Sequence, residues 1–499
     1  METLAALQGG SIEELRLVPG YADELGAAFA VRVEPTPLPD PYLIAFNPDV
    51  APLIGLAVSE AQRPEFVRLA AGNARFRTAE PFAAVYAGHQ FGTFVPQLGD
   101  GRAITLGEFE NPSGGRFEWQ LKGAGITAFS RFGDGRAVLR STIREYLASE
   151  ALAALSIPTT RALAIVGSDA PVFREKVETA AVLSRIAPSH VRFGSFEVFH
   201  YRGKFEEVAQ LADYVIERFY PELSSLERGE RYARFLREVT LRTARLFAEW
   251  QAVGFAHGVL NTDNMSILGL TLDYGPYGFL DEYEPEFICN HTDTGGRYSF
   301  ERQATIGLWN CHALAAALSS LVPETETGAA LAAYEPAFRA RLLELLRAKF
   351  GLETVAEGDA DLLATGLDAL AHGKVDYTAF FRRLGNVRRA SDPADDVLAE
   401  MFPNRDEWYA WLQRYRARLE REGSDDETRR AAMSARNPKY VLRNHLAQAA
   451  IEKAESRDYT ELARLHAILR RPFDEQPENE RYAEPPPAGA SRVEVSCSS

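Results

Sequence analysis

Two short segments of this sequence combine polar side chains with residues that end helices and form turns: Gly254-Phe-Ala-His257-Gly-Val-Leu-Asn-Thr-Asp263-Asn264 and Leu272-Asp273-Tyr274-Gly275. An amphipathic helix is expected directly before them, over residues 230–253, because apolar residues recur there at three- and four-residue steps and Gly254 is a helix-ending residue. Leu270-Thr-Leu272 indicates a short strand. Asparagine and aspartate oxygens suit a hard cation such as Mg²⁺. The two segments therefore predict a metal site formed by Asn264 and Asp273.

The spacing within these segments is that of kinase-like enzymes. His257 and Asn264 match the ends of a His-x-Asp-x4-Asn catalytic loop, and Asp273-Tyr-Gly275 matches the later Asp-x-Gly that binds a second metal ion. Taken singly, an Asp-Asn pair is a common turn and a lone histidine is usually a satisfied core residue. Taken together and in this order, the segments favour the kinase-like interpretation.

One position departs from that pattern. Val259, five residues before Asn264, stands where a kinase has its catalytic aspartate. Valine cannot accept a proton or orient a hydroxyl group. The protein is therefore either catalytically silent or uses another carboxylate, and Asp263 is the nearest candidate.

A glycine-rich turn precedes these segments, in Gln97-Leu-Gly-Asp-Gly-Arg-Ala-Ile-Thr-Leu-Gly107. Gly99 and Gly101 have no Cβ, so their backbone can approach a phosphate closely, and Arg102 adds a cation beside them. By itself such a turn is more often part of a hairpin. It predicts a phosphate-binding loop only in combination with a lysine and a glutamate further along the chain.

That lysine and glutamate are present at kinase-like spacing. Lys122 ends an apolar strand 21 residues after Gly101, and Glu145 comes 23 residues later on a helix expected over residues 136–155. In kinases such a pair orients the nucleotide phosphates. Glu150 is the competing carboxylate on another face of the same helix, and we favour Glu145.

Two further arginines, Arg185 and Arg192, lie on a strand-to-loop segment. Surface arginines are common, so spacing alone leaves their role open. With Arg102 and Lys122 they would give four cations around one triphosphate. Four cations would suit phosphates that are buried and bound differently from those of a kinase.

The bulk properties narrow the possible classes of protein. The chain has 499 residues and a net charge of −15, from 70 acidic and 55 basic side chains. An acidic surface repels nucleic acid and anionic lipid. No apolar run is long enough to span a bilayer, no secretory signal is recognisable at the start, and the three cysteines lack metal-site spacing. We expect a cytoplasmic monomer that binds neither nucleic acid nor membrane.

Element types change along the chain. Strands and glycine-rich turns are expected from about residue 85 to 200, and amphipathic helices from about 205 to 470. After Phe473 the acidic and proline-rich composition predicts a loosely ordered tail. This order predicts an α+β fold with one sheet-containing part and one helical part.

Several long motifs in this order resemble the selenoprotein O family. The matching stretches cover roughly residues 80 to 310, and the Asn437-Pro-Lys segment and the Cys-Ser-Ser end agree as well. They are Tyr86-Ala-Gly-His-Gln-Phe-Gly92, Gln97-Leu-Gly-Asp-Gly101, Gln120-Leu-Lys-Gly-Ala-Gly125, Phe132-Gly-Asp-Gly-Arg136, His257-Gly-Val-Leu-Asn-Thr-Asp-Asn264, Leu272-Asp-Tyr-Gly-Pro276 and Phe287-Ile-Cys-Asn-His-Thr-Asp293.

The resemblance implies a bilobal, protein-kinase-like fold, a pseudokinase that binds ATP in reversed orientation and transfers AMP to Ser, Thr or Tyr hydroxyls of proteins, with UMP transfer left open. It implies a division into an N-terminal extension (1–80), an N-lobe (81–204), a helical C-lobe (205–472) and a flexible tail (473–499). Asp263 would accept the proton, Asn264 and Asp273 would bind Mg²⁺ or Mn²⁺, and Glu145 would pair with Lys122. The residues expected to hold the nucleotide are Gly99, Gly101, Arg102, Lys122, Asp134, Gly135, Glu145, Arg185, Arg192 and Asp273.

Two alternatives stay open, a kinase-type phosphotransferase and a silent ATP-binding scaffold. Retention of both Asn264 and Asp273 argues against the silent scaffold.

The cysteines raise a separate question. A flexible tail would allow Cys497 to reach Cys289 and form a regulatory disulfide, although two unrelated thiols are an equally good interpretation.

Overall fold

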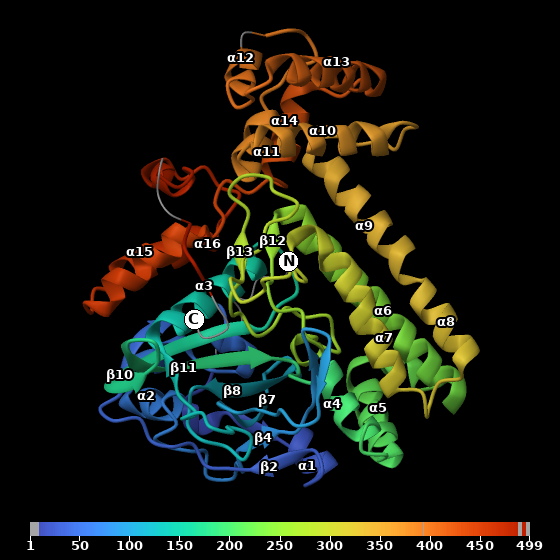
Figure 1. Cartoon of the computed structure of the whole chain (residues 1–499). Coiled ribbons are helices and arrows are strands. Elements are labelled where there is room, and N and C mark those ends of the chain that lie inside the picture. Colours follow the sequence, from blue (N-terminus) through green and yellow to red (C-terminus); the bar gives the residue numbers. More distant parts are fainter. Residues whose placement is uncertain (1–8, 393, 488–491, 496–499) are drawn as a thin grey trace.

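The computed structural model describes residues 9–392, 394–487 and 492–495, and an antiparallel sheet occupies much of its N-terminal part (Figure 1). The main strand order is β2-β4-β7-β8-β11-β10-β3, while β1 pairs with β7 and β9 with β11. The strands of this sheet are β1 (Arg16–Val18), β2 (Ala30–Arg32), β3 (Tyr42–Phe46), β4 (Phe82–Ala84), β7 (Ala103–Glu110), β8 (Arg116–Lys122), β9 (Ala137–Val138), β10 (Arg161–Phe173) and β11 (Val177–Ala187).

Strand β8 shows how the sheet separates its core from the site. Successive side chains of a strand point to opposite faces. Trp119 and Leu121 are buried in an apolar cluster with Phe66 of α2 (Pro64–Ala70), on one face. Gln120 and Lys122 alternate with them and point to the other face. The alternation thus delivers the predicted lysine to the face opposite that cluster.

Helix α3 (Leu139–Ala154) packs on β10 and β11 and is itself covered by α15 (Asn444–Glu455) and α16 (Thr460–Leu469). Its apolar stripe is buried, as the spacing predicts. The helix begins later than residue 136, because Ala137 and Val138 form β9 and pair with β11.

The rest of the chain is mostly helical, and Figure 1 shows α10 to α14 gathered apart from the sheet. These five helices share an apolar cluster that also includes Leu346 of α9 and, from the segment after α6, Ala256 and Phe287. The remaining helices are α1 (Tyr21–Leu25), α4 (Phe193–His200), α5 (Phe205–Phe219), α6 (Arg228–Val253), α7 (Gln303–Ala317), α8 (Glu324–Ala332), α9 (Tyr334–Lys349), α10 (Asp359–Gly373), α11 (Tyr377–Leu384), α12 (Ala394–Ala399), α13 (Arg405–Glu422) and α14 (Asp426–Ser434).

The long helix before the polar segments is confirmed. Helix α6 ends at Val253, and Gly254 follows in the left-handed conformation at φ +74°. After β12 (Phe255–Ala256) the chain makes a short 3₁₀ turn, η6 (Thr262–Asn264), and returns through β13 (Gly278–Phe279), which pairs with β12.

The strand predicted at Leu270–Leu272 is not present. Only Thr271 forms an isolated bridge, with Thr159. Gly269 before it and Asp273 after it both adopt positive φ angles, +71° and +57°. The left-handed positions on both sides of these three residues take the chain out of the extended conformation, so pairing is limited to the single bridge at Thr271.

The described part of the tail is more ordered than its composition predicts. Pro477–Tyr482 forms a 3₁₀ helix, η8, and Tyr482 is buried with its hydroxyl donating to Glu461 Oε1 at 2.6 Å. Lys439 pairs with two acidic tail residues, Glu475 at 2.7 Å and Glu480. The ion pairs with Lys439 compensate part of the negative charge of the segment, and the buried Tyr482 ring attaches it to the apolar core.

The protein is therefore a mixed α and β structure with a multi-stranded antiparallel sheet. Segments of residues 1–80 supply β1, β2 and β3 to the sheet, and the proposed four-part division of the chain stays a prediction. Among the described residues, no helix has both the length and the apolar character that crossing a membrane requires.

Candidate functional site

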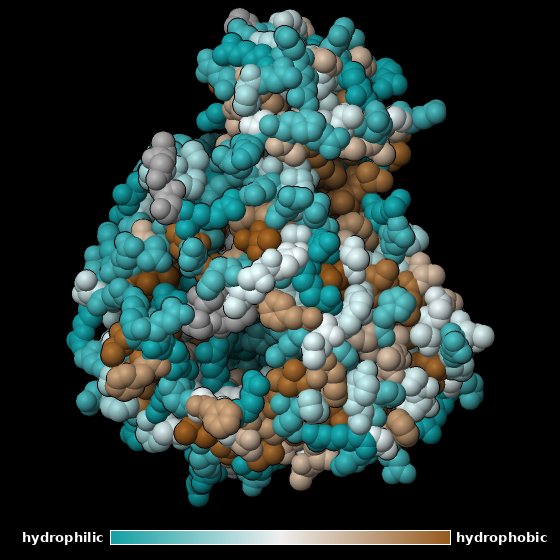
Figure 2. Space-filling model, in the orientation of Figure 1, coloured by the Kyte–Doolittle hydropathy of each residue, from teal (hydrophilic) through white to brown (hydrophobic). Residues whose placement is uncertain are grey.

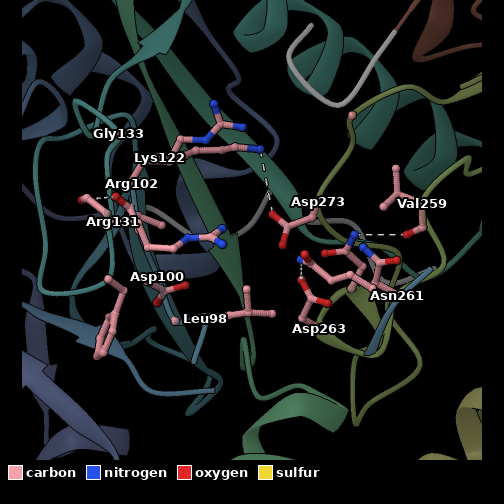
Figure 3. A pocket seen from close by; sticks show the side chains of 18 of the residues that line it. Leu98, Asp100, Arg102, Lys122, Arg131, Gly133, Val259, Asn261, Asp263 and Asp273 are labelled. Atoms are coloured by element: carbon pink, nitrogen blue, oxygen red, sulfur yellow. Dashed lines mark hydrogen bonds and ion pairs between the residues drawn. The ribbon is translucent and has the colours of Figure 1, made fainter. Parts of the chain in front are cut away.

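A cavity of about 610 Å³ lies between the sheet and the loops that follow α6, and it appears as a hollow in Figure 2. Apart from Glu145, all predicted site residues line it: Gly99, Gly101, Arg102, Lys122, Asp134, Gly135, Arg185, Arg192, Asp263, Asn264 and Asp273. Figure 3 shows Arg102 and Lys122 on one side, with Asp273, Asp263 and Val259 on the other. Residues up to 174 positions apart are thus brought to one place.

Glu145 lies behind this wall and pairs with Lys122. Its Oε2 accepts from Lys122 Nζ at 2.5 Å, while Glu150 binds Arg161 at 2.7 Å on another face of α3. Lys122 thus pairs with Glu145, whereas Glu150 pairs with Arg161. Burial and the nearby Arg185 lower the pKa of Lys122 to about 8, although Glu145 opposes this.

The two arginines converge on one carboxylate. Arg185, on β11, reaches Asp273 Oδ1 at 2.6 Å and Glu145 Oε1 at 2.6 Å. Arg192, the residue before α4, contacts Asp273 Oδ2 and donates to the backbone carbonyl of Asp263 at 2.6 Å. Burial alone would raise the pKa of Asp273, but Arg192, Arg185 and Lys122 together hold it well below its usual range. Asp273 is therefore a fixed anion and no proton acceptor.

The loop after α6 is tied to the Asp273 segment by His257. The imidazole is buried, and its Nε2 donates to Leu272 O at 2.9 Å while Nδ1 accepts from Val259 N at 3.4 Å. Burial lowers its pKa, so the ring is neutral. His257 is a structural link in this loop. Asn264 Nδ2 donates to Val259 O at 3.1 Å, which orients the amide of the predicted metal ligand.

Asp263 differs from Asp273 in its surroundings. Its Oδ2 accepts from the uncharged Gln90 amide at 3.1 Å, and Oδ1 is buried without a hydrogen-bond partner among the described residues. Burial raises the pKa of Asp263 to about 6, against the smaller effects of Gln90 and Arg192. Asp263 and Asp273 thus have opposite environments, and of the two only Asp263 retains the basicity of a proton acceptor. Asp100 also lines the cavity and burial raises its pKa, but its Oδ2 already accepts from the backbone N–H of Ala84 and its Oδ1 lies 3.9 Å from Arg192.

The glycines have a packing role. Gly99 adopts φ +96°, and a Cβ there would lie 2.4 Å from the ring of Phe129. Gly135 adopts φ +70°, and its Cβ would lie 2.1 Å from the carbonyl group of Gly125. Alanine at either position would force apart the two loops that form one wall of the cavity.

Asp134 does not project into the cavity unpaired. Its carboxylate accepts two hydrogen bonds from Arg174, at 2.8 and 2.9 Å, and one from the backbone N–H of Arg136. Arg174 also lines the cavity. Sequence reasoning gave no nucleotide-binding role to Arg174 or to two further lining cations, Arg131 and Arg136. Arg174 lies on the turn between β10 and β11 with no motif around it.

Other lining residues were also missed. Tyr86 stacks under the Arg192 guanidinium, with 4.8 Å from Cζ to the ring centroid. Gln90 contacts the Asp263 carboxylate. Both lie in Tyr86-Ala-Gly-His-Gln-Phe-Gly92, a stretch that carries the family resemblance but has no charged residue to suggest chemistry.

The predicted metal ligands fit a magnesium-type ion. Asn264 and Asp273 both line the cavity and offer an amide and a carboxylate oxygen. Mg²⁺ commonly takes one or two such ligands and completes its shell with water and substrate phosphates. Within residues 9–392, 394–487 and 492–495, no group of three or more His, Cys, Asp or Glu side chains could hold a metal ion by itself.

Comparisons with known proteins agree with the site. A family model described as protein adenylyltransferase SelO matches residues 14–470. The chain is 54% identical over 489 residues to the protein nucleotidyltransferase YdiU of Myxococcus xanthus, covering 98% of this chain and 100% of that protein. The YdiU proteins of Thiobacillus denitrificans and Thioalkalivibrio sulfidiphilus are 54% and 55% identical, over 98% of this chain and 100% and 99% of theirs. The chain belongs to the SelO family of protein adenylyltransferases and is a nucleotidyltransferase enzyme.

Proposed function

We propose that this protein transfers AMP from ATP to Ser, Thr or Tyr hydroxyls of other proteins and releases pyrophosphate. The observation that carries the proposal is the pair of carboxylates in one cavity. Asp273 is neutralised by two arginines, whereas Asp263 has one buried oxygen free of donors among the described residues. Val259 lines the same cavity where a kinase would have its base, so the proton acceptor must come from elsewhere.

The cations that line the cavity support ATP binding in an orientation reversed from that in kinases. Arg102, Lys122, Arg174, Arg185 and Arg192 line the cavity, and the last two are buried. A γ-phosphate bound deep among them would leave the α-phosphate toward Asp263. Charge that develops on the departing pyrophosphate would then be stabilised by groups already in place.

The reaction would proceed by in-line attack. The acceptor hydroxyl oxygen forms a bond to the α-phosphorus, and the bond from that phosphorus to the oxygen bridging to the β-phosphate breaks. The Asp263 carboxylate takes the hydroxyl proton, and pyrophosphate leaves with the bonding electron pair. Asp263 would contribute mainly in the transition state, so its loss should lower turnover more than ATP affinity.

Asn264 and Asp273 would hold Mg²⁺ or Mn²⁺, which supplies charge neutralisation at the phosphates when bound. Gln90 and Arg192 meanwhile hold the side chain and backbone of Asp263.

The sheet, the Lys122–Glu145 pair and the mostly helical part that follows support a bilobal kinase-like fold used as a pseudokinase. A cytoplasmic location, a monomeric state and the choice between ATP and UTP remain predictions.

The position of the label distinguishes the candidate reactions. We expect transfer of radioactivity to protein from α-labelled ATP and none from γ-labelled ATP, with Asp263→Asn as the matched variant that binds ATP but transfers little. Transfer from γ-labelled ATP alone would make the protein a kinase. ATP binding without transfer from either nucleotide would favour a silent scaffold.

A further inference from the structure

A small hairpin contacts residues 261–263 of the loop after α6, which we call the catalytic loop. Strands β5 (Gly88–Gln90) and β6 (Thr93–Val95) form this hairpin beside η6. The backbone N–H of His89 donates to Thr262 Oγ1 at 2.7 Å, the Gln90 amide donates to Asp263 Oδ2 at 3.1 Å, and the N–H of Phe91 donates to Asn261 Oδ1 at 3.2 Å. Three consecutive hairpin residues therefore bind three consecutive loop residues.

A buried acid reinforces the first of these contacts. Glu197, on α4, is fully buried and binds His89 Nδ1 at 2.6 Å through one oxygen and the Thr262 hydroxyl at 2.5 Å through the other. Because one carboxylate joins the hairpin and the loop, neither can shift along the other without breaking a buried hydrogen bond. The register of the hairpin against the loop is thus fixed.

Two glycines bring the backbone directly against Asp263. A Cβ at Gly88 would lie 2.7 Å from Asp263 Oδ1, and one at Gly194 would lie 3.5 Å from its Cα. The side chain is therefore confined by backbone on two sides. Within that confinement, the Gln90 contact decides which oxygen is occupied: Oδ2 is bound, while Oδ1 has no partner among the described residues.

We propose that Gln90 is a positioning residue for the transfer reaction, whose amide holds Asp263 Oδ2 and so fixes the orientation of the carboxylate that accepts the hydroxyl proton. The inference rests on the proposed function. An amide suits this task better than a cation would. It fixes the carboxylate by one directed hydrogen bond without adding the positive charge that makes Asp273 a poor acceptor.

The test separates positioning from general structure. Gln90→Ala should lower kcat by about tenfold to a hundredfold, the usual result of a misplaced catalytic group, and leave the KM for ATP within about twofold. Gln90→Glu keeps the length but places a second carboxylate against Oδ2, so it should lose at least as much. The matched control is Thr93→Ala, because Thr93 is exposed and pairs with Gln90 across the same hairpin.

A double-mutant cycle gives the decisive readout. In an Asp263→Ala background, measured by long incubation with α-labelled ATP, Gln90→Ala should cause no further loss, because Gln90 acts only through Asp263. Equal losses in both backgrounds, or a Gln90→Ala variant with wild-type kcat, would overturn the inference. Absence of transfer by the wild-type protein would instead reject the proposed function, and this inference with it.

Discussion

Asp273 combines an unusual backbone with an unusual charge environment. Its φ of +57° is a conformation that residues with a Cβ rarely adopt, and such strain is typical of functional sites. Both of its oxygens contact arginines, and the Arg185 and Arg192 side chains are almost fully buried. The residue therefore stabilises the cavity, in addition to its proposed role as a metal ligand.

The first prediction concerns these two roles of Asp273. Asp273→Asn should abolish transfer and also lower the stability of the nucleotide-free protein by on the order of 3 kcal/mol, because the buried Arg192 loses its nearest counter-charge and Arg185 keeps only that of Glu145. ATP should then raise the melting temperature of the variant more than that of the wild type, since phosphates would replace the missing anion. Differential scanning fluorimetry with and without ATP measures this.

A comparison variant at the edge of the cavity serves as the control for stability. Asp134→Asn removes the partner of Arg174, but the Asp134 side chain is 44% exposed, so the change should be below about 1 kcal/mol. If Asp273→Asn were as stable as Asp134→Asn, the arginines would not depend on Asp273.

Two shifted pKa values in the cavity predict the pH dependence. Asp263 accepts a proton only when ionised, so activity should fall as the pH drops through its pKa of about 6. Lys122 is charged only below a pKa of about 8, so phosphate binding by the free enzyme should weaken above it. A plot of kcat/KM across roughly pH 5 to 9 should therefore be bell-shaped, and Asp263→Asn should remove its acidic limb. An acidic limb that persisted in Asp263→Asn would belong to another group.

At the scale of elements, helix α3 carries two buried glutamates with different tasks. Glu145 binds Lys122 and Arg185 at the cavity wall. Glu150 binds Arg161 and accepts from the backbone N–H of Ala162 at 3.0 Å, which joins α3 to β10. The same residue type on the same helix therefore provides a matched pair.

We expect Glu145→Gln to weaken ATP binding and lower turnover, because Lys122 and Arg185 lose the charge that holds them in place. Glu150→Gln should lower the free energy of unfolding by about 1 to 3 kcal/mol and leave turnover per folded molecule unchanged. Nucleotide titration and urea unfolding of both variants separate the two effects. Loss of turnover in Glu150→Gln at wild-type ATP affinity would contradict this division.

At the scale of the whole molecule, the end of the chain returns to the region behind the catalytic loop. Val495 is buried, forms a bridge with Asn290 and accepts from the backbone N–H of His291 at 3.1 Å. Cys289 is the neighbouring residue and packs against Gly258, where a Cβ would lie 2.5 Å from its Sγ. Cys497 lies outside the described residues.

The suggested Cys289–Cys497 disulfide therefore stays a prediction, now with a reason for the two segments to meet. The bridge between Val495 and Asn290 brings the described end of the chain beside the segment that holds Cys289. Peptide mapping of oxidised protein by mass spectrometry should find the linked pair, and Cys311→Ser should leave it intact. Oxidised protein in which both thiols remain alkylatable would rule the bond out.

The spacing of residues along the sequence was enough to predict the helix before the catalytic loop and the strand that ends at Lys122. These are local properties, since the spacing of apolar residues and the position of Gly254 act within a few turns of chain. The choice of Glu145 over Glu150 rested on its kinase-like spacing from Lys122, with Glu150 on a different face of the helix. The strand expected at Leu270–Leu272 failed for a local reason too, because the left-handed residue at Asp273 is not visible in a pattern of apolar side chains.

Only the tertiary structure determined which polar groups meet. Nothing in the sequence pairs Asp134 with Arg174 or Gln90 with Asp263, because these contacts join segments 40 and 173 residues apart. The same holds for the basicity of the two aspartates. Asp263 and Asp273 are equivalent as residue types, and they differ because folding places arginines around one and an uncharged amide beside the other. Hydrogen bonds and burial set a pKa in three dimensions, and no periodicity of the chain encodes them.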